Sequence, residues 1–268
     1  MIKDIVVNLS VVKGAGPAGD YAVSVAAAFG AHVAGIAFLY DPLPRAGFID
    51  TQMRENSAAT KIAIERFAKA AASAGASADS LTLEASVTGA GNQFGRIARA
   101  FDLAIVGQAE PETSEVEEVI VEAALFDSGR PVIVVPYIQK APLKLDRVMV
   151  CWDGGRSATR AIADAMPLLE RAGHVEVVIV ADERSKQDEI EGADMGRHLA
   201  RHGLNVELKR TVLGDIDVAD VILSKAADGG TDFIVMGGYG HSRLREFVLG
   251  GVTRGILRSL TVPVLMSH

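Results

Sequence analysis

A glycine-rich stretch directly after an apolar run is the part of this sequence best suited to bind an anion. The run DFIVM is followed by GGYGHSRLREFVLGG, which covers residues 237–251. Glycines let a chain turn sharply off a strand and let backbone N–H groups face inward, where they form an anion-binding nest. A helix beginning at GGVTRGIL would add free N–H groups and the positive end of its dipole. The pattern indicates phosphate binding, with Arg243 and Arg245 as charge partners and Ser242 as a hydroxyl donor.

The elements that must position this stretch occur twice along the chain. The first half opens with DIVVNLS (4–10) and the second with DRVMVCWDGG (146–155), and each continues as strand and helix in alternation up to a proline-led last strand. Strands that are almost wholly apolar, separated by amphipathic helices, favour parallel sheets covered on both faces. We therefore expect an α/β fold of two tandem open parallel-sheet, Rossmann-like domains, residues 1–140 and 145–268, joined by a short linker in 137–145.

Two details of the repeat lead to local predictions. The first helix of each half ends close to a glycine, Gly30 or Gly173, which predicts a left-handed C-cap. The histidines that follow, His32 and His174, are then predicted to be cap residues.

Composition excludes several classes of protein. The chain has 268 residues, 49% of them apolar and 23% charged, and its net charge of −7 argues against a nucleic-acid partner. One cysteine, Cys151, excludes an intramolecular disulfide, and no Cys/His set has the spacing of a zinc site. No apolar stretch approaches the ~20 residues of a membrane span, and the first residues lack the features of a signal peptide. We expect a soluble cytoplasmic protein with no membrane partner.

The glycine pattern resembles the signature of a known family. In an open parallel sheet, ligands bind beyond the carboxyl ends of the strands. The pattern G-x2-G-x9-G, formed by Gly237, Gly240 and Gly250 after an apolar strand, resembles the nucleotide-binding signature of the universal stress protein family. Because both halves share the order of elements, the whole chain resembles a tandem universal stress protein. The resemblance implies an adenine nucleotide α-hydrolase-like fold, ATP or another adenine nucleotide bound in the C-terminal domain, with or without Mg²⁺, and a role in stress response or regulation.

The resemblance also implies which residues touch the nucleotide. Asp153 in CWDGG would lie near the adenosine, and the main chain of Val180 and Ala181 near the adenine. The ribose and phosphates would lie against Met236, Gly237, Tyr239, Gly240, Gly250, Gly251 and Val252, with Arg243 as a charge partner. Gly251 departs from the family pattern, which has Ser or Thr there, so one phosphate-binding hydroxyl is lost. Taken alone, Asp153 is better explained as a turn residue or a helix N-cap.

The corresponding loop of the first half has the opposite charge. Glu110 occupies the second glycine position, and further carboxylates follow at Glu112, Glu115, Glu117 and Glu118. Carboxylates and phosphates repel one another at such short range. This half also has Asn8 and Leu9 where the other has its first-strand aspartate. We predict that it binds no ATP and acts as a partner domain, with the closing strands 131–136 and 262–267 pairing within the chain; homodimer formation stays open.

The sequence favours a binding protein over an enzyme. It has no G-x4-G-K-[S/T], G-x-S-x-G or HExxH motif, and we assign no catalytic residue or protein-held metal site. His241 could act as an acid or base, but it is better explained as a polar loop residue exposed to water. Two alternatives stay open: slow ATP hydrolysis, and an interaction module with a vestigial loop. The insertion 41–57 is a lid, a contact surface or a variable loop.

Overall fold

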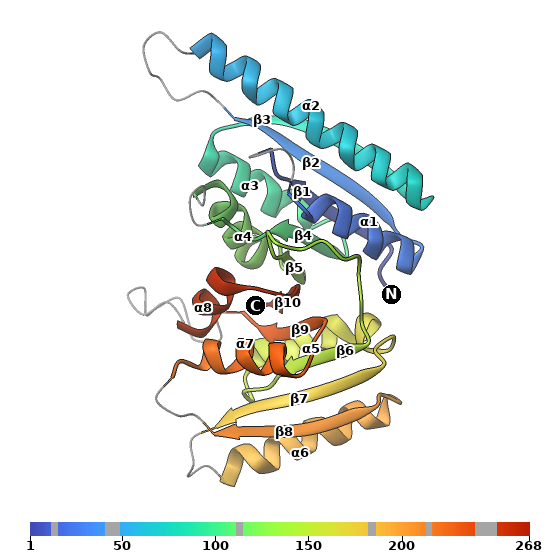
Figure 1. The fold of residues 1–268 in the computed structure, drawn as a ribbon, viewed down its shortest axis with the longest axis vertical. Coiled ribbons are helices and arrows are strands. Elements are labelled where there is room, and N and C mark those ends of the chain that lie inside the picture. Colours follow the sequence, from blue (N-terminus) through green and yellow to red (C-terminus); the bar gives the residue numbers. More distant parts are fainter. Residues whose placement is uncertain (12–15, 41–48, 111–114, 182–185, 213–215, 239–250) are drawn as a thin grey trace. The chain divides into compact units, whose positions relative to one another are not determined.

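The chain divides into two compact units, Met1–Leu143 and Lys144–His268, each built from alternating strands and helices (Figure 1). The structure is a computed structural model that describes residues 1–11, 16–40, 49–110, 115–181, 186–212, 216–238 and 251–268. Residues 41–48 of the insertion lie outside the described part, and its remainder belongs to a helix that begins at Ile49.

The N-terminal unit is a parallel sheet covered by helices. Its elements are β1 (Asp4–Leu9), α1 (Ala18–Phe29), β2 (His32–Tyr40), α2 (Ile49–Ala74), β3 (Ser77–Ala85), α3 (Val87–Ala98), β4 (Leu103–Gly107), α4 (Glu115–Asp127) and β5 (Val132–Val135). The strand order is β3-β2-β1-β4-β5, with parallel pairing. Helix α1 packs against α2, and α3 packs against α4. The chain crosses the sheet in one direction from β1 to β2 to β3, and in the opposite direction from β3 to β4 to β5. Right-handed crossovers therefore place α1 and α2 on one face of the sheet and α3 and α4 on the other.

The C-terminal unit has the same order of elements. They are β6 (Arg147–Cys151), α5 (Arg156–Leu169), β7 (His174–Ala181), α6 (Lys186–Arg201), β8 (Val206–Val212), α7 (Val218–Asp228), β9 (Phe233–Gly237), α8 (Gly251–Ser259) and β10 (Val264–Ser267). The strand order is β8-β7-β6-β9-β10, again parallel. Helix α5 packs on β9 and β10, α6 on β7 and β8, and α7 on α8.

Burial explains why the strands are so apolar. All four residues of β5, Val132–Val135, are fully buried, and so are Phe233, Ile234 and Val235 in β9. Helices α1 and α4 pack against β5, and α5 packs against β9, so these strands do not tolerate polar side chains. The outer strand β3 is covered less, and most of its residues are exposed. The predicted fold class, two open parallel-sheet α/β units in tandem, is confirmed.

Small residues bring the same pair of helices close together in both units. In the N-terminal unit, a Cβ at Gly91 of α3 would lie 2.6 Å from Val119 Cγ1 of α4. In the C-terminal unit, a Cβ at Gly255 of α8 would lie 2.6 Å from Ala219 Cβ of α7. The N-terminal unit has its glycine on the first helix of the pair, and the C-terminal unit has it on the second. In both units the glycine lets the two helix backbones approach closely. The repeat therefore extends to packing.

The two predicted glycine caps have different outcomes. Gly30 caps α1 with φ of 58°, which confirms the left-handed cap. The prediction for Gly173 is wrong, because α5 ends earlier at the right-handed residue Glu170. Gly173 is required for space instead: a Cβ there would lie 2.9 Å from the Asp146 carbonyl oxygen.

The two histidines are not caps either. His32 and His174 are the first residues of β2 and β7, and each contacts the next strand. His32 Nδ1 lies 2.9 Å from Ser77 Oγ, and His174 Nε2 lies 3.3 Å from Glu207 Oε2. They thus fasten the outer strand of each sheet.

Candidate functional site

The order of strands in the C-terminal unit creates a switch point between β6 and β9. From β6 the chain continues through α5 to β7 on one side, whereas β9 lies on the other side. Loops that leave two such strands diverge in opposite directions, and the crevice between them is where open α/β sheets bind ligands. The strand order therefore independently points to the carboxyl ends of β6 and β9.

The described residues of the predicted site all belong to this edge of the sheet. Asp153 follows β6, while Val180 and Ala181 end β7. Met236 and Gly237 end β9, and Gly251 and Val252 begin α8, which leads from this edge into β10. Tyr239, Gly240, Arg243 and Gly250 lie outside the described residues, as do Ser242, Arg245 and His241.

Asp153 forms a local turn. The Gly155 N–H donates a hydrogen bond of 2.8 Å to Asp153 Oδ1, and the aspartate side chain is exposed. This is an Asx-type turn, in which a short carboxylate bonds backbone two residues on. Gly155, not Asp153, is the N-cap of α5, and no side chain bonds the helix end there. The turn interpretation of Asp153 therefore holds, and the cap interpretation does not.

The neighbours of Asp153 contribute two further features that the sequence pattern does not reveal. Burial, with repulsion from Asp153, raises the pKa of the Cys151 thiol to about 12, so this cysteine stays protonated and is a poor nucleophile. Trp152 has a buried indole Nε1 without a hydrogen-bond partner among the residues that the structure describes. A lone Trp beside an aspartate gives no recognisable signal in the sequence.

Gly237 allows β9 to touch the first turn of α5. A Cβ at this position would lie 2.6 Å from the Ala158 nitrogen and 2.8 Å from the Ser157 carbonyl carbon. Both are backbone atoms, so no side-chain rotation could relieve the overlap. The first turn of a helix holds N–H groups without intrahelical partners. Gly237 therefore brings the end of β9 beside the donor end of α5.

Gly251, by contrast, has room around it. Among the residues that the structure describes, no heavy atom lies within 4 Å of the position that its Cβ would take. It is exposed at the start of α8, two residues before the buried Thr253. The hydroxyl that the family pattern has here is missing because of the residue type, and packing in the described part of the chain does not exclude it.

The N-terminal unit has a different chemistry at the equivalent edge. Strand β1 pairs from Asp4 with His32, and β6 pairs from Arg147 with His174. Equal spacing from these pairs places Ser10 at the position of Asp153, so the predicted counterparts, Asn8 and Leu9, are wrong by at least one residue. Ser10 Oγ donates a hydrogen bond of 2.9 Å to Glu117 Oε1 in the first turn of α4.

Glu117 is therefore a buried carboxylate where α4, the counterpart of α8, begins. It is 7% exposed, and burial, with a smaller contribution from repulsion by Glu110, raises its pKa, although hydrogen bonds from Ser10 and from its own backbone oppose the rise. A negative group beside Glu117 would meet both repulsion and the cost of desolvation. The sequence identifies the acidic loop, but it does not reveal that this one carboxylate is turned inward.

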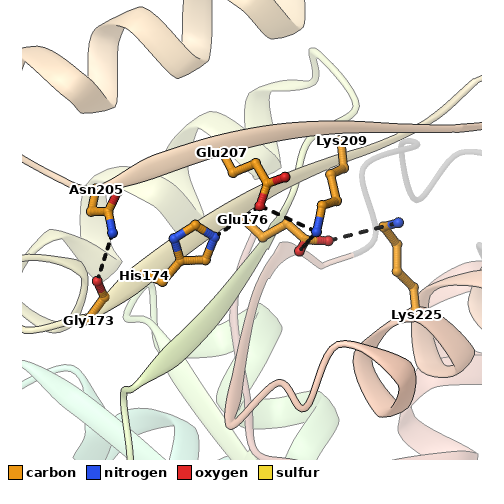
Figure 2. Close-up of polar contacts among 7 residues, drawn as sticks. All are labelled: Gly173, His174, Glu176, Asn205, Glu207, Lys209 and Lys225. Atoms are coloured by element: carbon orange, nitrogen blue, oxygen red, sulfur yellow. Dashed lines mark hydrogen bonds and ion pairs between the residues drawn. The ribbon is translucent and has the colours of Figure 1, made fainter.

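A polar cluster on β7, β8 and α7 has its charges paired internally (Figure 2). The buried Glu176 carboxylate lies 2.7 Å from Lys209 Nζ and 3.9 Å from Lys225 Nζ. Lys209 also lies 3.4 Å from Glu207, which in turn contacts His174. Desolvation tends to raise the pKa of Glu207. The hydrogen bonds and charges of Lys209 and His174 outweigh it, so the pKa of Glu207 is lowered. The cluster fastens the outer strand β8 to its neighbours, and its arrangement indicates a structural role.

Two other kinds of site find no support in the described part of the chain. None of its helices has the length and apolar character needed to cross a membrane. Within those same residues, no group of three or more His, Cys, Asp and Glu side chains is arranged to hold a metal ion.

Comparison with known proteins identifies the C-terminal half. Residues 144–268 match the sequence model of the Universal stress protein family. A universal stress protein of Synechocystis sp. is 27% identical over 175 residues, which are 62% of this chain and 57% of that relative. The crystal structure of a universal stress protein from Archaeoglobus fulgidus matches 98% of this chain and 95% of its own, with a TM-score of 0.75 and 19% identity.

A functionally unknown protein from Pseudomonas aeruginosa PAO1 has the same fold, with a TM-score of 0.65 and 16% identity over 99% of this chain and 92% of its own. At these identities, the solved structures establish the fold, whereas the match of the family model is to the sequence itself. Residues 144–268 therefore form a universal stress protein domain, which confirms the family resemblance for this half of the chain.

Proposed function

We propose that the C-terminal unit binds ATP or another adenine nucleotide at the carboxyl ends of β6, β7 and β9, and that binding serves a regulatory role in stress response. The observation that carries the proposal is the switch point. Asp153 follows one of its strands and Gly237 ends the other, while the donor end of α5 lies against Gly237. Donor groups of this kind stabilise phosphate oxygens.

The residues would divide the nucleotide between them. Asp153 would accept hydrogen bonds from the adenosine hydroxyls, and the main chain of Val180 and Ala181 would contact the adenine. The ribose and phosphates would lie against Met236, Gly237, Tyr239, Gly240, Arg243, Gly250, Gly251 and Val252. Because no metal cluster occurs in the described residues, Mg²⁺ would be held mainly by phosphate oxygens and water.

The N-terminal unit would bind no ATP. Its buried Glu117 faces the region where phosphates would have to lie, and Glu110 adds to the negative charge. We propose that this unit, residues 1–140, is a degenerate universal stress protein domain that pairs with its C-terminal neighbour, residues 145–268.

One observation favours a different function, an interaction module with a vestigial loop. Gly237 is required by its close approach to α5, so its presence needs no ligand. Slow ATP hydrolysis is the other alternative, and turnover that disappears with nucleotide binding would identify it.

Nucleotide content and affinity test the proposal directly. Denaturing extraction followed by chromatography should release up to one adenine nucleotide per chain, and ATP titration of the stripped protein, with and without MgCl₂, should show one site. Gly240→Glu should abolish binding because it adds a carboxylate to the loop. Glu110→Gly, its counterpart in the other unit, should change affinity little. Absence of both bound nucleotide and titration heat, or equal affinity in Gly240→Glu, would refute the assignment and favour the interaction module.

A further inference from the structure

The N-terminal unit contains a cavity of about 300 Å³ at the carboxyl edge of its sheet. Ser10 lies at the end of β1, Pro17 precedes α1, and Gln108 follows β4. Glu117 of α4 closes one side, and Ile138 lies in the segment that follows β5. The cavity therefore occupies the place where a parallel sheet presents its ligand, but with different walls from those of a phosphate site.

Glu117 provides an acceptor in this cavity that has no donor. Its Oε1 accepts the 2.9 Å hydrogen bond from Ser10. Its Oε2 is buried, and none of the residues that the structure describes offers it a hydrogen bond. A buried carboxylate oxygen without a donor is costly, and such groups are rare unless water, an ion or a ligand completes them. The side chain is 7% exposed, so bulk water does not hydrate it freely.

The charges around the cavity indicate what kind of donor fits. Glu110 is a second carboxylate in the wall, and its charge adds to that of Glu117. Arg66 also lines the cavity, but its guanidinium pairs with Asp20 across α1 and α2. Lys140 is exposed at the rim. The strongest unmet demand is thus for a cation with N–H donors near Glu117.

We propose that this cavity binds a small molecule carrying a primary ammonium group, whose N–H donates to Glu117 Oε2. The body of the molecule would be apolar, because Pro17, Ala18 and Ile138 line the cavity next to its polar end. This site is separate from the proposed nucleotide site, lies in the other unit and does not depend on ATP binding.

NMR titration of the full chain at pH 8 tests the proposal, with 4-phenylbutylammonium chloride as the probe and 4-phenylbutan-1-ol as its uncharged analogue. We expect the amine to bind and the alcohol not to bind. Glu117→Gln should weaken the amine at least tenfold, because a charge-assisted hydrogen bond is lost. Glu118→Gln is the matched control: it removes the same charge from the same helical turn, but its side chain is exposed, so affinity should stay within twofold. Absence of amine binding, or equal effects of the two variants, would overturn the proposal.

Binding to the wild-type protein at pH 5 supplies a second test that needs no variant. Protonation of Glu117, whose pKa is raised, removes the acceptor charge, so affinity should fall from pH 8 to pH 5. The groups that face it are Glu110, Arg66, Lys140 and Tyr40, and burial with the Glu117 charge raises the pKa of Tyr40, which stays neutral throughout. Affinity independent of pH would contradict the proposal. ATP titration should be identical for both glutamine variants, so failure here is distinguishable from failure of the nucleotide site.

Discussion

Replacing Gly237 with alanine should destabilise the C-terminal unit, because the contact between β9 and α5 leaves no room for a methyl group. The added Cβ would lie 2.6 Å from the Ala158 nitrogen, 2.8 Å from the Ser157 carbonyl carbon and 2.9 Å from Ser157 Cβ. Ordinary contact begins near 3.4 Å, so the strand and the helix must separate by about 0.8 Å. The overlapping atoms belong mostly to backbone, and a shift of the whole first turn of α5 is the only relief.

The magnitude follows from what is known of overpacked cores. Extra methyl groups in well-packed sites cost about 1–3 kcal/mol, and Gly237→Ala should fall in the upper half of that range because backbone has to move. For a unit of this size, each 1 kcal/mol lowers the midpoint of thermal unfolding by roughly 3–6 °C. Circular dichroism melts and urea titrations should therefore show a clear loss for Gly237→Ala.

The repeat offers a matched control at Gly107. This residue ends β4 as Gly237 ends β9, but the nearest atom to its added Cβ would be Ala18 Cβ at 3.9 Å. Gly107→Ala should change the free energy of unfolding by less than about 0.5 kcal/mol, as a substitution without steric conflict does. If the two variants unfold alike, Gly237 is not held by packing, and the explanation of this glycine through α5 is wrong.

Three further predictions concern single side chains. Gly251→Ser should raise ATP affinity about three- to tenfold, as one neutral hydrogen bond does, and should cost no stability, because its Cβ meets no atom of the described residues within 4 Å. Titration calorimetry and a thermal melt measure the two effects, and equal or weaker affinity would contradict the prediction. Lys209→Met should cost about 1–3 kcal/mol in urea unfolding, because it removes the nearest partner of the buried Glu176, whereas Lys61→Met, which breaks an exposed pair with Glu65, should cost less than about 0.5 kcal/mol. Glu117 has a raised pKa in the folded state, so the fold holds its proton more tightly than the unfolded chain does; the resulting stability is present below pH 4.5 and is lost as pH rises through the folded pKa. Glu117→Gln should therefore gain stability relative to the wild type between pH 4.5 and pH 7.5 in urea titrations, and Glu118→Gln should show no such trend.

The order of elements could be predicted from sequence because a strand that is buried on both faces is a short, almost wholly apolar run of residues. Runs such as VIVV in β5 and FIVMG in β9 contain almost nothing that needs water, and the helices between them supply the alternation. The repeat then fixes the parallel arrangement, since each short apolar strand must return to the same edge. The carboxyl edge as the place of the candidate site follows from this arrangement alone.

The reasons for individual glycines could not be predicted, because they depend on atoms far away in the chain. Gly173 appears in sequence as a helix cap, yet the atom that excludes a side chain there is the Asp146 carbonyl oxygen. Gly237 appears as part of a ligand loop, yet its nearest neighbours are backbone atoms of α5. In both cases the sequence pattern suggests a local role for the glycine. The atoms that exclude a side chain come into contact with it only when the chain folds.

The burial of the Glu117 side chain likewise depends on the folded chain and could not be predicted from the sequence. It gives the N-terminal unit a different chemistry at the same edge of the sheet. In sequence it is one of several carboxylates in an acidic segment, indistinguishable from Glu115 and Glu118. The pitch of α4 then buries Glu117 while leaving those two exposed, and Ser10, the residue that follows β1, donates a hydrogen bond of 2.9 Å to it. One buried carboxylate reverses the electrostatic preference of the edge without moving a strand, because the cost is local and the sheet bears none of it. The packing of α3 on α4 through Gly91 and that of α7 on α8 through Gly255 meanwhile remain alike. Glu117, which adds negative charge at this edge, is therefore a different residue from Gly91, which lets α3 and α4 pack closely.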